Sequence, residues 1–269
     1  MLRNLYKKTA SIAGVWLGAC CLIVSAQVST PVDFLGYELG DRFTRHHKVV
    51  DYAKALAASS ERASWSTYGR TSEFRELGLL VVTSPENQGR LEALREANLE
   101  RAKGGRLTTD DSGVVFVWLS YNVHGNEAVC TEAALRTMHA LVSGTDAGGR
   151  DVGAWLERAV VIIDPCVNPD GRDRYVAFQD RTSGLSPDAN PGAIEHDEPW
   201  PGGRSNHYMF DMNRDWAWQT QIETQGRVSA YRNWMPQVHV DFHEQGVNSP
   251  YYFAPAAEPF HRVISPWQR

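Results

Sequence analysis

The stretch "VVFVWLSYNVHGNEAVCTEAAL", residues 114–135, decides the fold class of this chain. Residues 114–120 form an apolar run of strand length, and a helical apolar pattern extends from about Glu127 to Val142, where Gly144 closes it. An unbroken apolar strand that leads into a helix is typical of a sheet whose two faces are both covered. The stretch therefore predicts an α/β protein.

The same alternation of strands and helices continues on both sides of this stretch. Ser84 and Pro85 have the residue types of an N-cap and a first helical position, and Gly104 with Gly105 would end that helix. We predict one domain, residues 27–269, with a three-layer α/β/α fold and a mixed, mainly parallel sheet. The expected helices are 49–57, 85–103, 127–142, 152–159 and 218–234, and the expected strands are 77–84, 114–120, 160–164 and 237–243, with a turn at 168–171 and a long loop at 179–208.

The first 26 residues have the pattern of an export signal. Arg3, Lys7 and Lys8 precede the apolar run "SIAGVWLGACCLIVSA", residues 11–26, which ends in a small-residue cleavage pattern. The run is short for a membrane span, although an uncleaved anchor is an alternative. A second alternative is lipid attachment at Cys20, because "LGAC" resembles a bacterial lipoprotein box. We therefore expect an exported protein, periplasmic or extracellular.

Composition and charge limit the remaining functional classes. The chain is 42% hydrophobic and 22% charged, which fits a globular domain, and its net charge of −5 makes nucleic acid an unsuitable partner. Two cysteines, Cys130 and Cys166, lie outside the export segment, and they match no CxxC metal or redox motif. They could form a disulfide or be buried thiols.

His124 and Glu127 form a His-x-x-Glu pair where the central strand leads into its helix. Chance alone supplies such a pair in about one of two chains of this composition, so the pair needs supporting context. Ligands of open α/β sheets bind at the carboxyl ends of strands, where this pair lies, but a zinc site needs a third protein donor. His243 ends the strand 237–243 and can reach the same edge, whereas His239 is about 13 Å further back along the strand and is expected nearer the core.

Four motifs in order resemble the zinc carboxypeptidases of the carboxypeptidase A type. They are "HGNE" (124–127), "NPDGR" (168–172), "DMNRDW" (211–216) and "DFHEQG" (241–246), and "YGRTSEFREL" (68–77) is similar to a further stretch of that family. The resemblance implies a peptide substrate with a free C-terminal carboxylate and a zinc carboxypeptidase-like fold. It implies Zn²⁺ ligands at His124, Glu127 and His243, a carboxylate anchor at Asn213 and Arg214, and an orienting aspartate at Asp211.

The family also uses an arginine to stabilise the oxyanion, and four arginines have a suitable place in the chain. All four lie between the "NPDG" motif and the Asn-Arg pair; they are Arg172, Arg174, Arg181 and Arg204. We favour Arg204 as this catalytic residue, because the adjacent glycines permit close approach to a ligand and the same loop leads into Asn213.

The general-base glutamate of the family has no clear counterpart in the sequence. Glu244 directly follows a predicted ligand in a strand, so its side chain should point away from His243, and Glu258 lacks a matching context. We expect a chain that is incomplete at its C-terminus, lacks the last strands and helices, and leaves a sheet edge and a core face uncovered. Such a chain should hold zinc and a carboxylate but turn over slowly or not at all.

The sequence therefore predicts an exported zinc metallocarboxypeptidase, a hydrolase that cleaves the C-terminal peptide bond with a metal-activated water. One alternative keeps the zinc site but acts as a deacylase or a cell-wall peptide amidohydrolase. A second alternative is a non-catalytic protein of the same fold that binds peptide C-termini.

Overall fold

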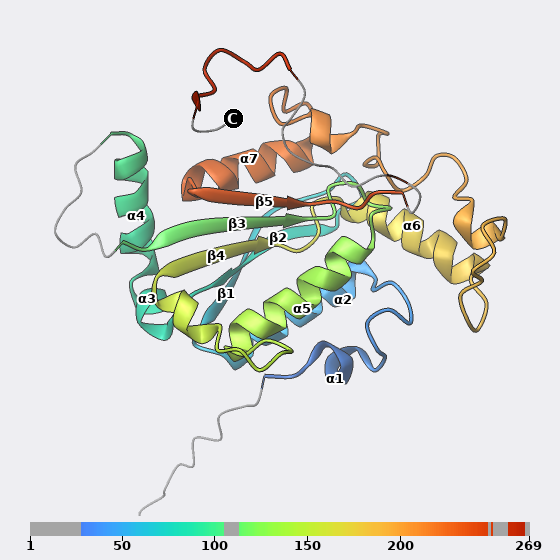
Figure 1. The fold of residues 1–269 in the computed structure, drawn as a ribbon, viewed down its shortest axis with the longest axis horizontal. Coiled ribbons are helices and arrows are strands. Elements are labelled where there is room, and N and C mark those ends of the chain that lie inside the picture. The colour runs from blue at the N-terminus through green and yellow to red at the C-terminus, as the bar shows by residue number, and fades with distance from the viewer. Residues whose placement is uncertain (1–27, 105–112, 247–248, 250–257, 267–269) are drawn as a thin grey trace, which may run out of the picture.

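The computed structural model describes residues 28–104, 113–246, 249 and 258–266 (Figure 1). The predicted export signal, residues 1–26, and the alternative lipid site Cys20 lie outside these residues. Within the described ranges, no helix combines the length and the apolar character that crossing a membrane requires.

A five-stranded mixed sheet forms the middle of the molecule, with the strand order β1-β2-β4-β3-β5. The parallel pairs are β3 with β4 and β3 with β5, and the antiparallel pairs are β1 with β2 and β2 with β4. The predicted mixed sheet is confirmed, with its four pairs divided equally between the two directions. The strands are β1 (Ala63–Arg70), β2 (Glu76–Val82), β3 (Val115–Tyr121), β4 (Ala159–Asp164) and β5 (Val238–Phe242).

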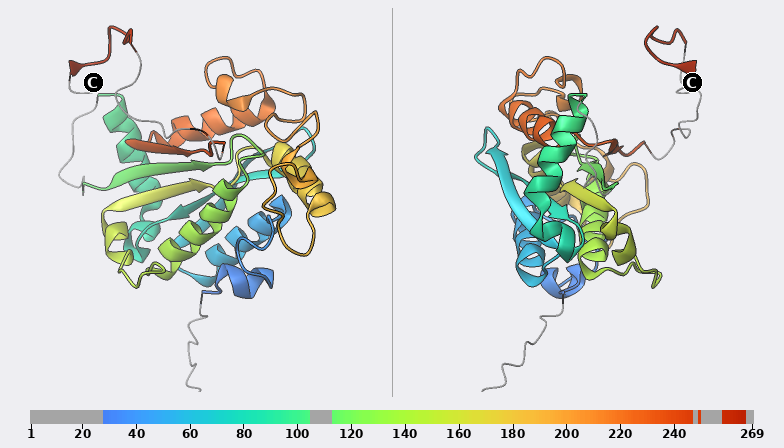
Figure 2. Two further views of the ribbon diagram at one scale, coloured as in Figure 1. Left: turned by 45° about the vertical axis from the view of Figure 1, so that its right-hand side comes forward. Right: turned by 90° about the vertical axis from the view of Figure 1, so that its left-hand side faces the viewer.

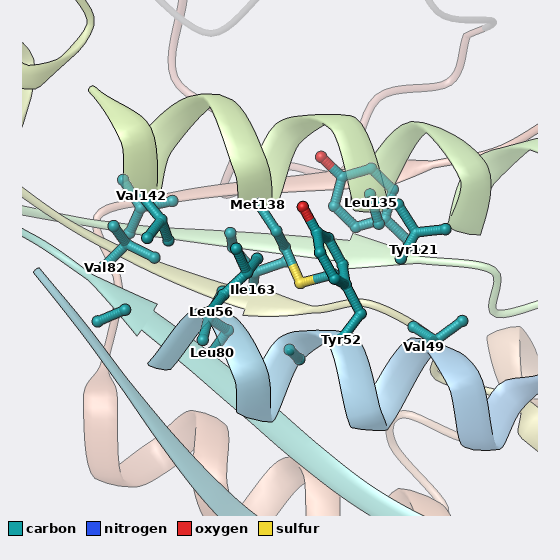
Figure 3. Close-up of a cluster of buried hydrophobic side chains, with 14 of the residues drawn as sticks. Val49, Tyr52, Leu56, Leu80, Val82, Tyr121, Leu135, Met138, Val142 and Ile163 are labelled. Atoms are coloured by element: carbon teal, nitrogen blue, oxygen red, sulfur yellow. The ribbon is translucent and has the colours of Figure 1, made fainter. Parts of the chain in front are cut away.

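Helices α2 (His46–Ser59) and α5 (Val129–Ser143) cover one face of the sheet, beside the short α1 (Pro31–Leu35) (Figure 1). In α2 the buried apolar residues Val49, Tyr52, Ala53 and Leu56 recur at the spacing of one helix face. They pack with residues of α5 and with strand residues such as Ile163 in one buried cluster (Figure 3). This cluster is the main core of the protein.

Helices α4 (Leu91–Ala102) and α7 (Ile222–Trp234) pack on the opposite face of the sheet. A second buried cluster lies there, and it includes Phe116, Trp118 and Ile162 from the central strands and Leu94 from α4. Successive residues of β2 alternate between the two clusters, as a strand covered on both sides requires. The predicted three-layer fold is thus confirmed, and Figure 2 shows the layers from two further sides.

The helix predicted at residues 85–103 is in fact two helices. Ser84 caps the first as predicted, because its hydroxyl accepts the Asn87 backbone N–H at 3.2 Å. The first helix, α3 (Pro85–Gly89), ends at Arg90, where the backbone leaves helical geometry and α4 begins. The buried Asn87 amide donates to the carbonyl oxygens of Leu156 and Glu157. These long-range bonds fix α3 in a different direction from α4.

The predicted turn at residues 168–171 is the beginning of helix α6 (Pro169–Thr182). Asn168 is the N-cap, since its side-chain oxygen accepts the Gly171 N–H at 3.0 Å, and Pro169 takes the first helical position. The predicted long loop therefore begins only after Thr182. It contains the short 3₁₀ helix η2 (Ile194–His196); the other two 3₁₀ helices described are η1 (Gly153–Glu157) and η3 (Met212–Arg214).

The carboxyl ends of three neighbouring parallel strands meet at one edge of the sheet. Ser120 of β3 pairs with Asp164 of β4 on one side and with Asp241 of β5 on the other. Strand β5 lies at the end of the strand order, and Val238 and Val240 remain 45% and 38% exposed. Within the described part of the chain β5 is thus an edge strand, and the residues that follow β3 and β5 are placed side by side.

Candidate metal centre

The three predicted zinc ligands converge at this edge of the sheet. His124 and Glu127 lie in the loop between β3 and α5, and His243 directly follows β5. Nδ1 of His124 lies 2.7 Å from Glu127 Oε1, and Nδ1 of His243 lies 2.9 Å from Glu127 Oε2. One donor atom from each residue lies within 4.8 Å of the other two, so the three side chains can bind one metal ion.

Each histidine directs its second ring nitrogen at an aspartate. Nε2 of His124 is 3.1 Å from Asp211 Oδ1, and Nε2 of His243 is 3.1 Å from Asp241 Oδ2. A carboxylate in this position keeps the proton on Nε2, which leaves the lone pair of Nδ1 for a metal and makes the ring more basic. The predicted orienting role of Asp211 is consistent with this contact, and Asp241 has an equivalent place beside the other histidine.

The donor set fits zinc. Two imidazole nitrogens and one carboxylate are a known catalytic set for Zn²⁺, and they leave a coordination position for water or substrate. Burial raises the pKa of the Glu127 carboxyl group, but hydrogen bonds and the nearby charge of His124, with further bonds from Glu244 and His243, hold that pKa below its ordinary value. The carboxylate form, which a metal requires, is thus the favoured form of Glu127.

The predicted carboxylate anchor lies beside His243. Asp211 caps η3 by accepting the Asn213 N–H at 2.9 Å, and the same helix carries Arg214. The Asn213 amide nitrogen is 3.3 Å from Nε2 of His243, so the anchor contacts the candidate metal centre. Arg214 is exposed, and its Nη1 donates to the Asn213 carbonyl oxygen at 3.2 Å.

Of the four arginines considered from the sequence, Arg204 is the one placed beside the candidate ligands. Its guanidinium lies 3.0 Å from Asp211 and 3.9 Å from Glu127, and half of the side chain is exposed. Arg172 is fully buried and bonded, and Arg174 binds the backbone of Gly202 and Asn206. Arg181 is exposed in the last turn of α6.

His239 and Glu244, which the sequence analysis set apart from the metal ligands, lie within and just after strand β5. Nε2 of His239 lies 3.0 Å from the Ser120 hydroxyl, away from the Glu127 carboxylate. The residue is exposed, so the expected place nearer the core is wrong, because β5 is an edge strand. Glu244 accepts the Val129 N–H at 2.6 Å and so binds the N-terminus of α5, which confirms that its side chain turns away from His243. Burial raises the pKa of the Glu244 carboxyl group.

Sequence reasoning missed the contacts that hold the start of α6. Thr71 donates its hydroxyl to Asp170 at 2.7 Å, and Arg75 binds Asp170 at 2.7 Å and Asp173 at 2.8 Å. Thr71 and Arg75 belong to the stretch "YGRTSEFREL", so the resemblance pointed to them without giving their structural role. They join β1 and β2 to the helix that borders the site.

The two cysteines of the described residues are both free and buried. Burial raises the pKa of Cys130 and of Cys166 to about 12, so both are neutral thiols at ordinary pH. The alternative of a disulfide between them is not realised in the structure.

A three-layer α/β fold with two histidines and a glutamate at the carboxyl ends of its strands is typical of metal-dependent hydrolases. The chain matches the family model described as zinc carboxypeptidase over residues 49–239, and it belongs to that family. This match ends before Asp241 and His243, so the structure places the third candidate ligand independently. No curated protein matches the chain significantly.

One solved carboxypeptidase structure supports the fold, and further ones are similar to the chain. A protein described as a carboxypeptidase from Burkholderia mallei is 18% identical, with a TM-score of 0.53 over 83% of this chain and 44% of that one. Carboxypeptidase A from Helicoverpa armigera is 16% identical, with a TM-score of 0.47 over 78% and 47%. A metallocarboxypeptidase from Pseudomonas aeruginosa is 16% identical, with a TM-score of 0.47 over 76% and 40%. The chain thus spans less than half the length of each of these three proteins.

Proposed function

We propose that this protein is an exported zinc-dependent carboxypeptidase that acts on peptides with a free C-terminal carboxylate. The observation that carries the proposal is the cluster of His124, Glu127 and His243, whose donor atoms lie within 4.8 Å of one another. The Asn213 amide nitrogen lies 3.3 Å from His243, which supports a carboxylate anchor beside that cluster. Family membership supports the same class of reaction.

His124, Glu127 and His243 would hold the metal through two Nδ1 atoms and one carboxylate. Bound zinc supplies a Lewis acid that polarises a carbonyl group and lowers the pKa of a water molecule. Asp211 and Asp241 fix the ring orientations of the two histidines through their Nε2 atoms. The protein therefore contributes a preorganised donor set before metal and substrate arrive.

Arg214 and Asn213 would select substrates by their C-terminal carboxylate. A guanidinium group binds a carboxylate through two parallel hydrogen bonds, and an exposed arginine is available to an incoming peptide. Arg204, 3.9 Å from Glu127, is placed to donate to the oxyanion that forms at the scissile carbonyl group. Its bond to Asp211 orients the guanidinium toward the candidate metal centre.

The carboxylates that border the ligands already have partners. Asp211 and Asp241 face the histidines, and Glu244 binds the N-terminus of α5. We therefore assign the general base to none of these three carboxylates. The anchor of Asn213 and Arg214 is expected to bind peptide C-termini beside the metal.

Peptide binding tests the anchor. Zinc-loaded protein should bind an N-acetylated tripeptide on the order of 10- to 100-fold more tightly than its C-terminal amide, because hydrogen bonds to a charged group are lost with the amide. Arg214→Met should remove this preference, and Arg181→Met, a change at an exposed arginine away from the anchor, should preserve it. Equal binding of acid and amide by the unchanged protein would contradict the proposal.

Product analysis separates the alternatives. Release of the C-terminal amino acid from peptides, even at a low rate, supports the carboxypeptidase. Release of an acyl group or of a cell-wall amino acid instead would support the deacylase or amidohydrolase. Selective binding with no turnover, also in a chain extended past residue 269, would support the non-catalytic binding protein.

Export is proposed on the pattern of residues 1–26. Secretion in a bacterial host and N-terminal sequencing of the mature protein should give Gln27 as its first residue. A mature chain that begins with a lipid-modified Cys20 would establish the lipoprotein alternative and a membrane-attached location. Recovery of the intact N-terminus in the cytoplasm would contradict export.

A further inference from the structure

We propose that Asn122 is a positioning residue that sets the conformation of the ligand loop, residues 123–127, and thereby the affinity of the metal centre. The inference rests on the proposed zinc site, and it assigns the preorganisation of that site to a residue that binds neither metal nor substrate. Asn122 follows the last residue of β3 and lies two residues before His124. It is fully buried.

The Asn122 amide nitrogen contacts three backbone carbonyl oxygens of the ligand loop. Nδ2 lies 2.6 Å from the carbonyl oxygen of His124, 3.3 Å from that of Gly125 and 3.0 Å from that of Glu127. Three loop carbonyls thus turn inward to one donor group. Because the carbonyls point inward at this donor, the backbone is curved tightly enough for the His124 and Glu127 side chains to meet at 2.7 Å.

The Asn122 side-chain oxygen is held from the other side. It accepts Nη1 of Arg172 at 3.1 Å and the Thr131 hydroxyl at 3.1 Å. These donors determine the orientation of the amide, since a flipped amide would direct its NH₂ group at the Arg172 guanidinium. The ligand loop is consequently anchored through Asn122 to both α6, which carries Arg172, and α5, which carries Thr131.

The backbone of Asn122 offers a simpler explanation for the asparagine, and it can be tested separately. Its φ of 62° is in the left-handed region, which asparagine and glycine tolerate better than other residues. If conformation alone explained the residue, glycine would replace it without loss. Asn122→Gly keeps access to this φ and removes the amide, so it separates the two roles.

The experiment compares zinc affinity in the full chain and two variants, measured by competition with a chromophoric chelator. Asn122→Gly should weaken zinc binding at least about 10-fold, the scale of outer partners of metal sites. It should also change the electronic spectrum of the Co²⁺-loaded protein, which reports ligand geometry. If the glycine variant fails to fold, Asn122→Asp takes its place. It keeps an acceptor for Arg172 but turns a charged carboxylate oxygen toward the loop carbonyls, so it should lower zinc affinity to a similar extent.

A matched control is available at another buried asparagine. Asn98 in α4 is equally buried, and its amide donates to the carbonyl oxygens of Trp234 and Met235, away from the site. Asn98→Ala should lower the free energy of unfolding. It should keep the zinc affinity within about threefold of the wild type and leave the Co²⁺ spectrum unchanged. Wild-type zinc affinity and an unchanged spectrum in the folded Asn122 variants would refute the role of Asn122. Failure of the wild-type chain to bind zinc would instead refute the proposed zinc site.

Discussion

Replacing Arg172 with methionine tests whether this arginine is a structural or a catalytic residue. Arg172 has no exposed surface, and its guanidinium donates to Glu132 at 2.5 Å and to the carbonyl oxygens of Thr44 and Ala128. Arg172→Met leaves the buried Glu132 carboxylate without its cationic partner. Breaking a buried ion pair in this way costs about 3–5 kcal/mol, a large part of the 5–15 kcal/mol that stabilises a typical domain.

The assay is urea unfolding at 25 °C followed by circular dichroism. The free energy of unfolding should fall by about 3–5 kcal/mol in Arg172→Met and by less than about 0.5 kcal/mol in Arg181→Met, an exposed position on the same helix. The double variant Arg172→Met/Glu132→Met should regain part of the loss, because no uncompensated buried charge remains. An Arg172→Met protein as stable as the wild type, but with impaired peptide binding or turnover, would refute this reasoning and return Arg172 to the candidate catalytic arginines.

Three more predictions concern other parts of the fold. Gly125→Ala should lower the free energy of unfolding in urea by roughly 1–3 kcal/mol or more and weaken zinc binding. A Cβ at this position would overlap the backbone of Gly171 and Arg172 in α6 and the carbonyl oxygen of Gly203. Wild-type values for both measurements would contradict this packing. Ser84→Ala should cost about 1 kcal/mol in the same measurement through loss of the α3 cap, and no change would show that the cap contributes nothing. Burial raises the pKa of Asp164 to about 7 in the folded protein, above its value in the unfolded chain. The wild type should therefore lose stability relative to Asp164→Asn as the pH rises from about 4 to 7, because the carboxyl group ionises more readily in the unfolded chain. Parallel profiles of the free energy of unfolding against pH would contradict this assignment.

The elements with strong local signals could be predicted from the sequence. The apolar runs of β3 and β4 and the helical apolar spacing of α2 and α5 correspond to elements of the structure within a few residues. Strand β1, Ala63–Arg70, was not predicted, because it is an edge strand whose residues are mostly polar or half-exposed. The break between α3 and α4 depends on contacts of Asn87 with residues 69 and 70 positions away, which no local pattern contains.

For the candidate site, the resemblance implied three ligands far apart in the chain, and the order of the strands explains how they meet. His124 and His243 each follow a parallel strand, and β3 and β5 are neighbours, so the two residues meet at one edge. The residues that hold the site rigid gave no such signal. Glu132 and Thr44 are 88 residues apart, and no local pattern indicates that they are in contact. The sequence favoured Arg204 over Arg172, Arg174 and Arg181 without showing that Arg172 is fully buried.

Zinc content is the most direct test of the central claim that His124, Glu127 and His243 form one metal centre. Protein that is freed of metal, reloaded with Zn²⁺ and dialysed should contain one zinc per chain by atomic emission. His243→Ala should lose this zinc, whereas His239→Ala, a change within β5 at a histidine that contacts Ser120, should keep it. Zinc retained by His243→Ala, or lost only from His239→Ala, would contradict the account.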